Sequence, residues 1–251
     1  MMSFCSPSNR HQHRKNKNMK ILITGGSSGI GASIAEHFCQ KSPENRVTVL
    51  DQAESKTKGV KSILIDLLKS QNVEDFNQQT DLYDVVINSA GMREIKTPHD
   101  LSNDEWRQVI ELNLTVPFMI AIRQIQKALN ANKKLSIINI GSISGLQAEP
   151  DRCAYVSSKF GLIGLTKQLA FQYGKYGIRT NVICPGVIET PMTASYFQDP
   201  VLVEKIKKST PVGHWGQTFH IVPLIDLCID NEYLNGSTLV CDGGWTAGKD
   251  L

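Results

Sequence analysis

Short apolar segments alternate with helix-like segments along almost the whole chain, and this alternation limits the possible folds more than any other feature. The strand candidates are rich in Ile, Val and Leu with little polar alternation, which is typical of strands buried on both faces. They cover residues 20–24, 46–50, 62–65, 84–88, 135–141, 178–184 and 237–241. The helix candidates are residues 29–41, 69–79, 103–129, 153–175 and 218–229. This order predicts an α/β fold, a doubly wound parallel sheet of about seven strands with helices on both faces.

The length of 251 residues suits one large domain, and the sequence shows neither an internal repeat nor a linker. We therefore predict a single domain over residues 19–251. Residues 186–216 form the longest irregular stretch, and long loops in such sheets are usually functional, so we expect a substrate lid there. Residues 1–18 are polar and basic, and we expect a disordered tail or sequence upstream of a true start at Met19.

Charge and cysteine usage exclude several classes of partner. The tail carries Arg10, Arg14, Lys15 and Lys17 without an acid, so removing these four cations from the net charge of +3 leaves −1 for the rest. A nearly neutral body gives no basic surface for nucleic acid. No apolar run reaches the roughly 20 residues that span a bilayer, and we expect no membrane contact. Six scattered cysteines without a C-x-x-C pair indicate reduced thiols in the cytoplasm and no metal site.

A glycine-rich turn follows the first predicted strand directly and leads into a helix. It reads Thr24-Gly-Gly-Ser-Ser-Gly-Ile-Gly31. Glycines at such a turn allow a tight bend, close approach of a pyrophosphate to the backbone, and close packing of helix on strand. The helix N-terminus then presents N–H groups and its positive dipole end to the phosphates. The turn predicts a dinucleotide site, and Asp51, 20 residues after Gly31, is placed to accept hydrogen bonds from the adenosine ribose.

Three polar residues form a second candidate group near the carboxyl edge of the predicted sheet. Tyr155 and Lys159 lie four positions apart on a predicted helix and so share one face. Ser142 comes thirteen residues before Tyr155, just past the buried strand 135–141. Parallel α/β sheets bind their ligands at this edge, so a hydroxyl, a phenol and an ammonium are expected to meet there.

These motifs, in this order and spacing, resemble the short-chain dehydrogenase/reductase family over residues 19–246. Further matching pieces are Asp66, Asn88-Ser89-Ala90-Gly91, Asn113, Pro185-Gly186, Thr190 and the terminal segment 235–244. The resemblance implies an enzyme that moves a hydride between a nicotinamide cofactor and a secondary alcohol or ketone of a small to medium substrate.

The resemblance also implies residue roles. Tyr155 would be the general acid/base, Ser142 would hold the substrate oxygen, Lys159 would bind the nicotinamide ribose, and Asn113 would anchor a water in a proton relay. The implied cofactor residues are Thr24, Gly25, Ser27, Ser28, Gly29, Ile30, Gly31, Asp51, Asp66, Leu67, Asn88, Ala90, Gly91, Tyr155, Lys159, Pro185, Gly186, Ile188 and Thr190. A nearby ammonium and the positive charge of NAD⁺ should lower the pKa of the Tyr155 phenol from its usual value near ~10.

The substrate stays open at this point. Arg93 follows the Asn-Ser-Ala-Gly turn and is either a site for a substrate carboxylate or phosphate or a solvated surface residue. Met192, Tyr196 and Phe197 either line an apolar pocket or form the core of the lid. Alternatives to a generic alcohol dehydrogenase are an NADPH-dependent 3-oxoacyl-carrier-protein reductase and a non-catalytic nucleotide-binding regulator, which need not retain the Ser, Tyr, Lys and Asn set.

Three finer expectations concern the cofactor, the Asn113 carbonyl and the subunit interface. NAD(H) should be preferred over NADP(H), because Asp51 would repel a 2′-phosphate and no arginine lies in the glycine turn or directly after Asp51 to bind it. Lys56 and Lys58 could reach the phosphate if their loop folds back. Pro117 lacks an N–H, so the Asn113 carbonyl four residues earlier would lose its helical partner and could hold a water. By resemblance to the family's dimers and tetramers, the helices at 103–129 and 153–175 should form a subunit interface.

Overall fold

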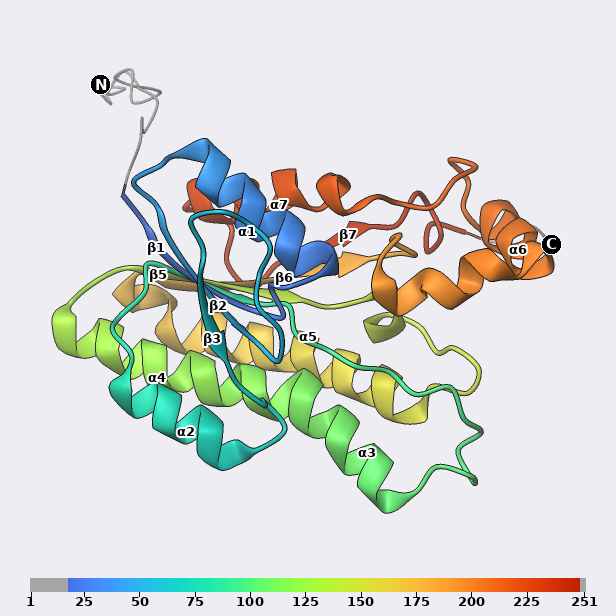
Figure 1. Ribbon diagram of the computed structural model, residues 1–251, viewed down its shortest axis with the longest axis horizontal. Helices are drawn as coiled ribbons and strands as arrows, with labels where there is room; N and C mark the ends of the chain where they lie inside the picture. The colour runs from blue at the N-terminus through green and yellow to red at the C-terminus, as the bar shows by residue number, and fades with distance from the viewer. Residues whose placement is uncertain (1–17, 249–251) are drawn as a thin grey trace, which may run out of the picture.

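In the computed structural model, which describes residues 18–248, seven parallel strands form one sheet with helices on both faces (Figure 1). The strand order is β3-β2-β1-β4-β5-β6-β7. The strands are β1 (Lys20–Thr24), β2 (Arg46–Asp51), β3 (Lys61–Leu64), β4 (Val85–Asn88), β5 (Leu135–Ile140), β6 (Ile178–Pro185) and β7 (Thr238–Cys241). The fold class and all seven predicted strands are confirmed, with ends that differ by one residue at most. The expected tail lies almost wholly outside the described residues.

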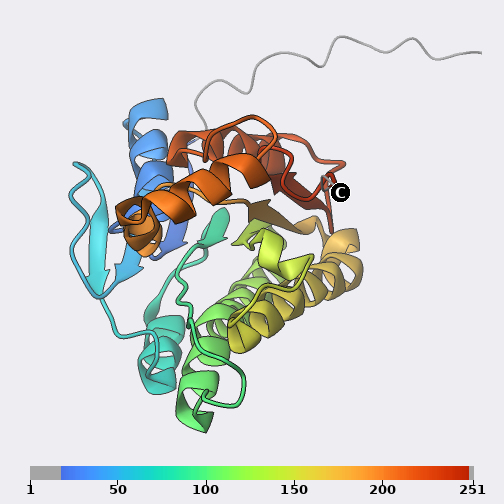
Figure 2. The same ribbon diagram turned by 90° about the vertical axis from the view of Figure 1, so that its right-hand side faces the viewer.

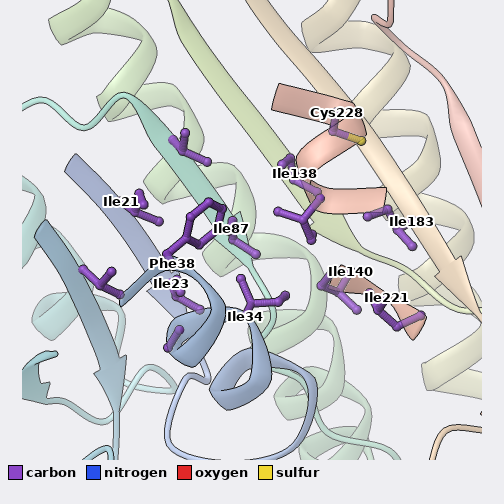
Figure 3. Packing of buried hydrophobic residues seen from close by; sticks show 14 of the residues in the cluster. Ile21, Ile23, Ile34, Phe38, Ile87, Ile138, Ile140, Ile183, Ile221 and Cys228 are labelled. Atoms are coloured by element: carbon purple, nitrogen blue, oxygen red, sulfur yellow. The ribbon is translucent and has the colours of Figure 1, made fainter. Parts of the chain in front are cut away.

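The two helical layers follow from the alternation of side chains along each strand. Ile21 and Ile23 of β1 face α1 (Gly29–Lys41) and α7 (Val222–Asp230), whereas Leu22 faces the opposite layer. That layer holds α2 (Ser70–Gln79), α4 (Val116–Ala131) and α5 (Cys153–Tyr173). Figure 3 shows the first layer, where Phe38 of α1 packs among isoleucines of several strands. Because both faces of the sheet are covered, its central strands can be apolar throughout.

The helix predicted over 103–129 is in fact interrupted. Helix α3 (Asn103–Ile110) is followed by a π-helical turn, Glu111–Thr115, before α4 begins. The Val116 N–H bonds the Glu111 carbonyl, five residues back, where a regular α-helix would reach back four. Such single π turns are often found at functional sites, and this one carries Asn113.

The 186–216 segment, expected to be irregular, contains two helices. A 3-10 helix spans Pro191–Gln198, and α6 spans Pro200–Ser209. The carboxylate of Asp199 accepts hydrogen bonds from the Val201 and Leu202 N–H groups, and Pro200 occupies the first turn, so α6 has strong start signals that the sequence reading missed. In Figure 2 this orange segment faces the viewer, at one end of the sheet. Within residues 18–248, no helix combines the length and apolar character needed to cross a bilayer.

Candidate active site

The strand order places the site at the point where the direction of winding changes. Strands β1 and β4 are neighbours, with Thr24 in register with Asn88, although two strands and two helices separate them in sequence. The connections after β1 and β4 therefore leave in opposite directions and open a crevice between them. A cavity of about 380 Å³ lies there, bounded by the turns after β1, β4, β5 and β6.

Backbone crowding explains the glycines after β1. Gly25 has a φ of +68°, and a Cβ on it would lie 2.6 Å from the Ala90 Cα. A Cβ on Gly31 would lie 2.1 Å from the Gly25 carbonyl oxygen. No other residue fits at these positions without moving the backbone. The turn therefore lines the cavity with bare peptide groups at the start of the 13-residue helix α1, which suits a bound pyrophosphate.

A carboxylate closes one end of the cavity. Asp51, the last residue of β2, accepts a hydrogen bond from the Ser27 N–H at 3.0 Å through one oxygen and from the Gln52 N–H at 2.7 Å through the other. Its side chain thus stabilises the glycine turn and also lines the cavity. Leu67 lines the same end, as predicted from the resemblance.

Five of the residues predicted to bind cofactor or act in catalysis do not line the cavity: Thr24, Ser27, Asp66, Asn88 and Asn113. The side chains of Thr24, Asp66, Asn88 and Asn113 make hydrogen bonds elsewhere, whereas Ser27 contributes its backbone N–H to Asp51. Thr24 Oγ1 accepts from the N–H groups of Ser89 and Ala90, both at 3.1 Å. Asn88 donates to Asn139 Oδ1 at 2.7 Å. These side chains hold together the backbone turns that do line the cavity.

Asp66 and Asn113 act in the same manner. Asp66 accepts from the Leu68 N–H at 3.1 Å and from Gln52 Nε2 at 3.1 Å. Asn113, 1 % exposed, accepts from the Met92 N–H at 2.9 Å and donates to the Met92 carbonyl at 2.8 Å and to Ser158 Oγ at 3.0 Å. Its amide fixes the turn after β4 against α5. Any part in a proton relay therefore falls to the Asn113 backbone carbonyl.

The structure brings Ser142, Tyr155 and Lys159 together at the other end of the cavity. Ser142 ends the turn after β5, and the other two lie one helical turn apart near the start of α5. Lys159 is 4 % exposed, and its ammonium lies 5.5 Å from the centre of the Tyr155 ring. Pro185, Gly186, Ile188 and Thr190 line the cavity from the turn after β6.

Burial dominates the electrostatics of this group. Burial raises the pKa of the Tyr155 phenol, and the hydrogen bond with Ser142 opposes this rise only in part. The expected lowering of the Tyr155 pKa is thus wrong for the protein alone, because desolvation outweighs the nearby positive charges. Burial also lowers the pKa of Lys159 to about 8.

Four polar residues near Ser142 were not singled out from the sequence. Ser144 Oγ lies 3.1 Å from Ser142 Oγ and donates to Glu149 at 2.6 Å. Glu149 pairs with Arg152 at 3.0 Å. Glu94 accepts from the N–H groups of Ala154 at 2.6 Å and Tyr155 at 3.1 Å, and so caps the start of α5. Ser144, Glu149 and Arg152 form a local network within residues 142–152, whereas Glu94 comes from a distant segment.

Arg93, Arg152 and Tyr196 meet at the mouth of the same end. Both guanidiniums donate a hydrogen bond to the Tyr196 hydroxyl, and all three side chains line the cavity. Arg93 is therefore half-buried at the cavity mouth, where two protein groups accept its hydrogen bonds. Tyr196 lies in the cavity wall, whereas Phe197 packs against Trp215, with ring centres 4.4 Å apart.

Comparison with known proteins identifies relatives that match 90% or more of this chain. The model of the short chain dehydrogenase family matches residues 19–201. The chain is 32% identical over 243 residues to a 3-oxoacyl-(acyl-carrier-protein) reductase of Chlamydia trachomatis, covering 90% of this chain and 97% of that protein. It is 28% identical over 242 residues to a cyclopentanol dehydrogenase of Comamonas, covering 90% and 96%. A solved 4-hydroxyisoleucine dehydrogenase complexed with NADH is 39% identical, with a TM-score of 0.88, covering 92% of this chain and all of that one.

Proposed function

This chain belongs to the short-chain dehydrogenase family, and from that premise we propose how its residues oxidise a secondary alcohol or reduce the matching ketone. The enzyme is an NAD(P)-dependent oxidoreductase that acts on CH–OH groups. The observation that carries the residue assignment is the convergence of Ser142, Tyr155 and Lys159 on one end of a cavity whose other walls are the glycine turn and Asp51.

Tyr155 is the group that moves the proton in this proposal. Its phenol exchanges a proton with the substrate oxygen, while Ser142 donates a hydrogen bond to that oxygen, where negative charge develops during reduction. The nicotinamide, when bound, accepts or donates the hydride. Because burial raises the pKa of Tyr155 in the protein alone, the phenolate needs added positive charge, which an oxidised nicotinamide would supply when bound.

The glycine turn and the residues around it fit a dinucleotide. Gly25, Ser28 and Gly29 line the cavity, and a Cβ at Gly25 would clash with the backbone of Ala90. Asp51 would hold the adenosine ribose, and Lys159 the nicotinamide ribose. Ile188 and Thr190 would hold the carboxamide side.

We infer that the cofactor is NAD(H). Asp51 is the last side chain of β2 and lines the cavity next to exposed Gln52, and no arginine lies in the glycine turn or directly after Asp51. The similar 4-hydroxyisoleucine dehydrogenase is complexed with NADH. A more distant relative, a 2-deoxy-D-gluconate 3-dehydrogenase 26% identical to this chain, instead has NADP bound. The cofactor preference of this chain therefore has to be measured directly.

A 3-oxoacyl-carrier-protein reductase is the second candidate. The 32% identity to the chlamydial reductase over 90% of this chain favours it. That reaction uses a long carrier-bound thioester, whereas the 4-hydroxyisoleucine dehydrogenase acts, by its name, on a small hydroxylated amino acid. The higher identity to the latter leads us to favour a small to medium substrate.

We further infer a single domain over residues 19–251, with the 186–216 segment as its substrate lid, and a cytoplasmic homodimer or homotetramer with no nucleic-acid or membrane partner. The five cysteines at 39, 153, 184, 228 and 241 are free thiols, which suits a reducing compartment. Large exposed apolar side chains on the helices of one layer, Phe118 of α4 and Phe160 and Phe171 of α5, support the oligomer.

A substrate screen with the purified protein tests the proposed function. Secondary alcohols, polyols and hydroxy acids are offered with NAD⁺, and ketones and 3-oxoacyl thioesters with NADH and NADPH, while nicotinamide fluorescence is followed. We expect turnover of small alcohols or ketones. Turnover confined to carrier-bound thioesters would favour the second candidate, and cofactor binding without any turnover would contradict the assignment.

A further inference from the structure

Two arginines from distant parts of the chain converge at the substrate end of the cavity. Arg93 lies in the connection after β4, and Arg152 directly precedes α5. Both line the cavity together with Ser142 and Tyr155, and both donate to the Tyr196 hydroxyl. Arg93 also donates to the Met192 carbonyl at 2.6 Å, and its guanidinium lies 4.4 Å from the centre of the Tyr196 ring.

The charges of these arginines are only partly balanced. Arg152, whose side chain is 14% exposed, pairs with Glu149 at 3.0 Å. Glu94, next to Arg93 in sequence, is committed to the N–H groups at the start of α5. Within residues 18–248, Arg93 makes no ion pair with an acidic side chain. Of the two guanidiniums, only that of Arg152 thus has a carboxylate partner, and the Tyr196 hydroxyl lies where their N–H donors meet.

Such an arrangement is matched to an anion. A guanidinium presents five N–H donors in a rigid fork that fits the two oxygens of a carboxylate. Arg93 uses only two donor contacts in the structure, which leaves further N–H groups for an acceptor. An anion at this point would balance a cation that is partly removed from water, where charge pairing is stronger than at the surface.

The arginines also lie at a defined place relative to the reacting group. Ser142 Oγ is linked to Ser144 Oγ at 3.1 Å, Ser144 to Glu149 at 2.6 Å, and Glu149 to Arg152 at 3.0 Å. This chain of contacts fixes Arg152 with respect to the oxygen that Ser142 would hold. A substrate with its hydroxyl at Ser142 and Tyr155 and an anionic group a few carbons away meets both sites.

We propose that Arg93 and Arg152 form a carboxylate subsite, so that the substrate is a small hydroxy acid or the matching oxo acid. This inference rests on the proposed function, because it assumes that the alcohol carbon is oxidised at Ser142 and Tyr155. In the competing role, which we call a latch, the two arginines would only hold the 186–216 segment in place through their hydrogen bonds to Tyr196. The two roles differ in what they predict for charged and uncharged substrates.

Paired substrates that differ only in charge provide the test. The kcat/KM values with NAD⁺ are measured for 3-hydroxybutyrate and 4-hydroxypentanoate and for their methyl esters. We expect the acids to be preferred by about tenfold or more. Arg93→Gln and Arg152→Gln should lower kcat/KM for the acids by about 10- to 100-fold more than for the esters, the range for losing a charge-assisted hydrogen bond. Arg93→Lys should restore part of the loss.

Inhibition by non-reacting anions gives a second readout. Butyrate and inorganic phosphate are tested as competitive inhibitors of the best substrate from the screen, charged or not. We expect butyrate to inhibit wild type and to lose about tenfold or more in affinity in either arginine variant. Stronger inhibition by phosphate would show that the subsite takes a phosphate group and would overturn the carboxylate assignment.

Two further variants separate the subsite from a latch. Tyr196→Phe removes the shared hydroxyl, so a latch predicts the same loss as the arginine variants, whereas a carboxylate subsite predicts butyrate affinity at least equal to that of wild type. Arg107→Gln on α3 removes an exposed guanidinium paired with Asp104 and is the matched control, expected to change nothing.

The outcomes distinguish this inference from the proposed function. If esters are oxidised as well as acids, or if the arginine variants lower both equally, the subsite is wrong while the dehydrogenase stands. If NADH binds, as fluorescence would show, but no alcohol or ketone of either charge is converted, the proposed function itself fails.

Discussion

The Lys159 ammonium donates a hydrogen bond to the Ile140 carbonyl oxygen at 2.9 Å and is thereby held at the end of the interior strand β5. This bond holds Lys159 beside the Tyr155 ring and at the cavity wall. It does not compensate for burial, which lowers the pKa of Lys159 to about 8 from 10.5. The folded protein therefore keeps the Lys159 ammonium in a buried position, where the charged form is less favourable than in water.

The lowered pKa of Lys159 predicts a pH-dependent stability difference from Lys159→Met. Between pH 8 and 10.5 the unfolded lysine binds more protons than the folded one, so wild type gains stability as the pH rises through this window. The free energy of unfolding of wild type relative to the variant should rise by about 3 kcal/mol between pH 7.5 and 10.5. This value follows from the lowering of the Lys159 pKa from 10.5 to about 8, at about 1.36 kcal/mol per pKa unit. Denaturant unfolding at a series of pH values measures it. Lys58→Met, on an exposed loop, serves as the control, and a constant difference for Lys159→Met would contradict the prediction.

Tyr155→Phe removes the proposed acid/base while keeping the ring that lines the cavity. Turnover should fall by roughly 10²–10⁴, the usual contribution of a positioned acid/base. NADH affinity, measured by fluorescence titration, should stay within about threefold of wild type, because the change removes only a hydroxyl. Near-normal turnover would show that another group moves the proton.

Asp51→Asn tests the preference for NAD(H), since the amide removes the charge but can still accept from the Ser27 N–H. Wild type should prefer NADH by at least about tenfold in kcat/KM with one common substrate. The reason is that the Asp51 carboxylate and the 2′-phosphate of NADPH would repel each other: like charges at ~4 Å repel by about 4 kcal/mol at an effective dielectric of about 20, and by less where solvent screens them. The variant should narrow this ratio mainly by improved use of NADPH. A tenfold preference for NADPH in wild type would overturn the proposal.

Exposed phenylalanines on the helical layer predict an oligomer. The side chains of Phe118 on α4 and Phe160 on α5 are 45% and 47% exposed, and burying them against a second subunit would be favourable. Wild type should be a dimer or tetramer by light scattering at micromolar concentration, and Phe118→Asp with Phe160→Asp should dissociate it. Phe219→Ser, at an exposed position outside these helices, should leave the mass unchanged. A monomeric wild type would refute the interface.

Pro117→Ala tests the part of the Asn113 backbone. Proline cannot donate to the carbonyl four residues back, and the π turn Glu111–Thr115 directly precedes it. Alanine would supply an N–H for the Asn113 carbonyl and slow proton transfer, seen as a lower kcat and a changed pH profile. An unchanged rate and profile would mean that Pro117 only shapes the helix.

Local sequence was sufficient for the strands, for the glycine turn and for the pairing of Tyr155 with Lys159. Apolar runs identify buried strands because both faces of this sheet are covered, and a separation of four residues on a helix fixes two side chains on one face whatever surrounds them. Gly25 and Gly31 are likewise required by backbone crowding within one turn and its immediate neighbour.

Tertiary structure alone decided what lies between distant segments. Arg93, Arg152 and Tyr196 are separated by at least 44 residues from one another, and only the packing of three connections at one edge of the sheet brings them to a common point. The side chains of Asn88 and Asp66 hydrogen bond with Asn139 and Gln52, which lie in other segments of the chain. The pKa of Tyr155 rose rather than fell because burial depends on everything packed around the phenol, which no spacing along the chain reveals.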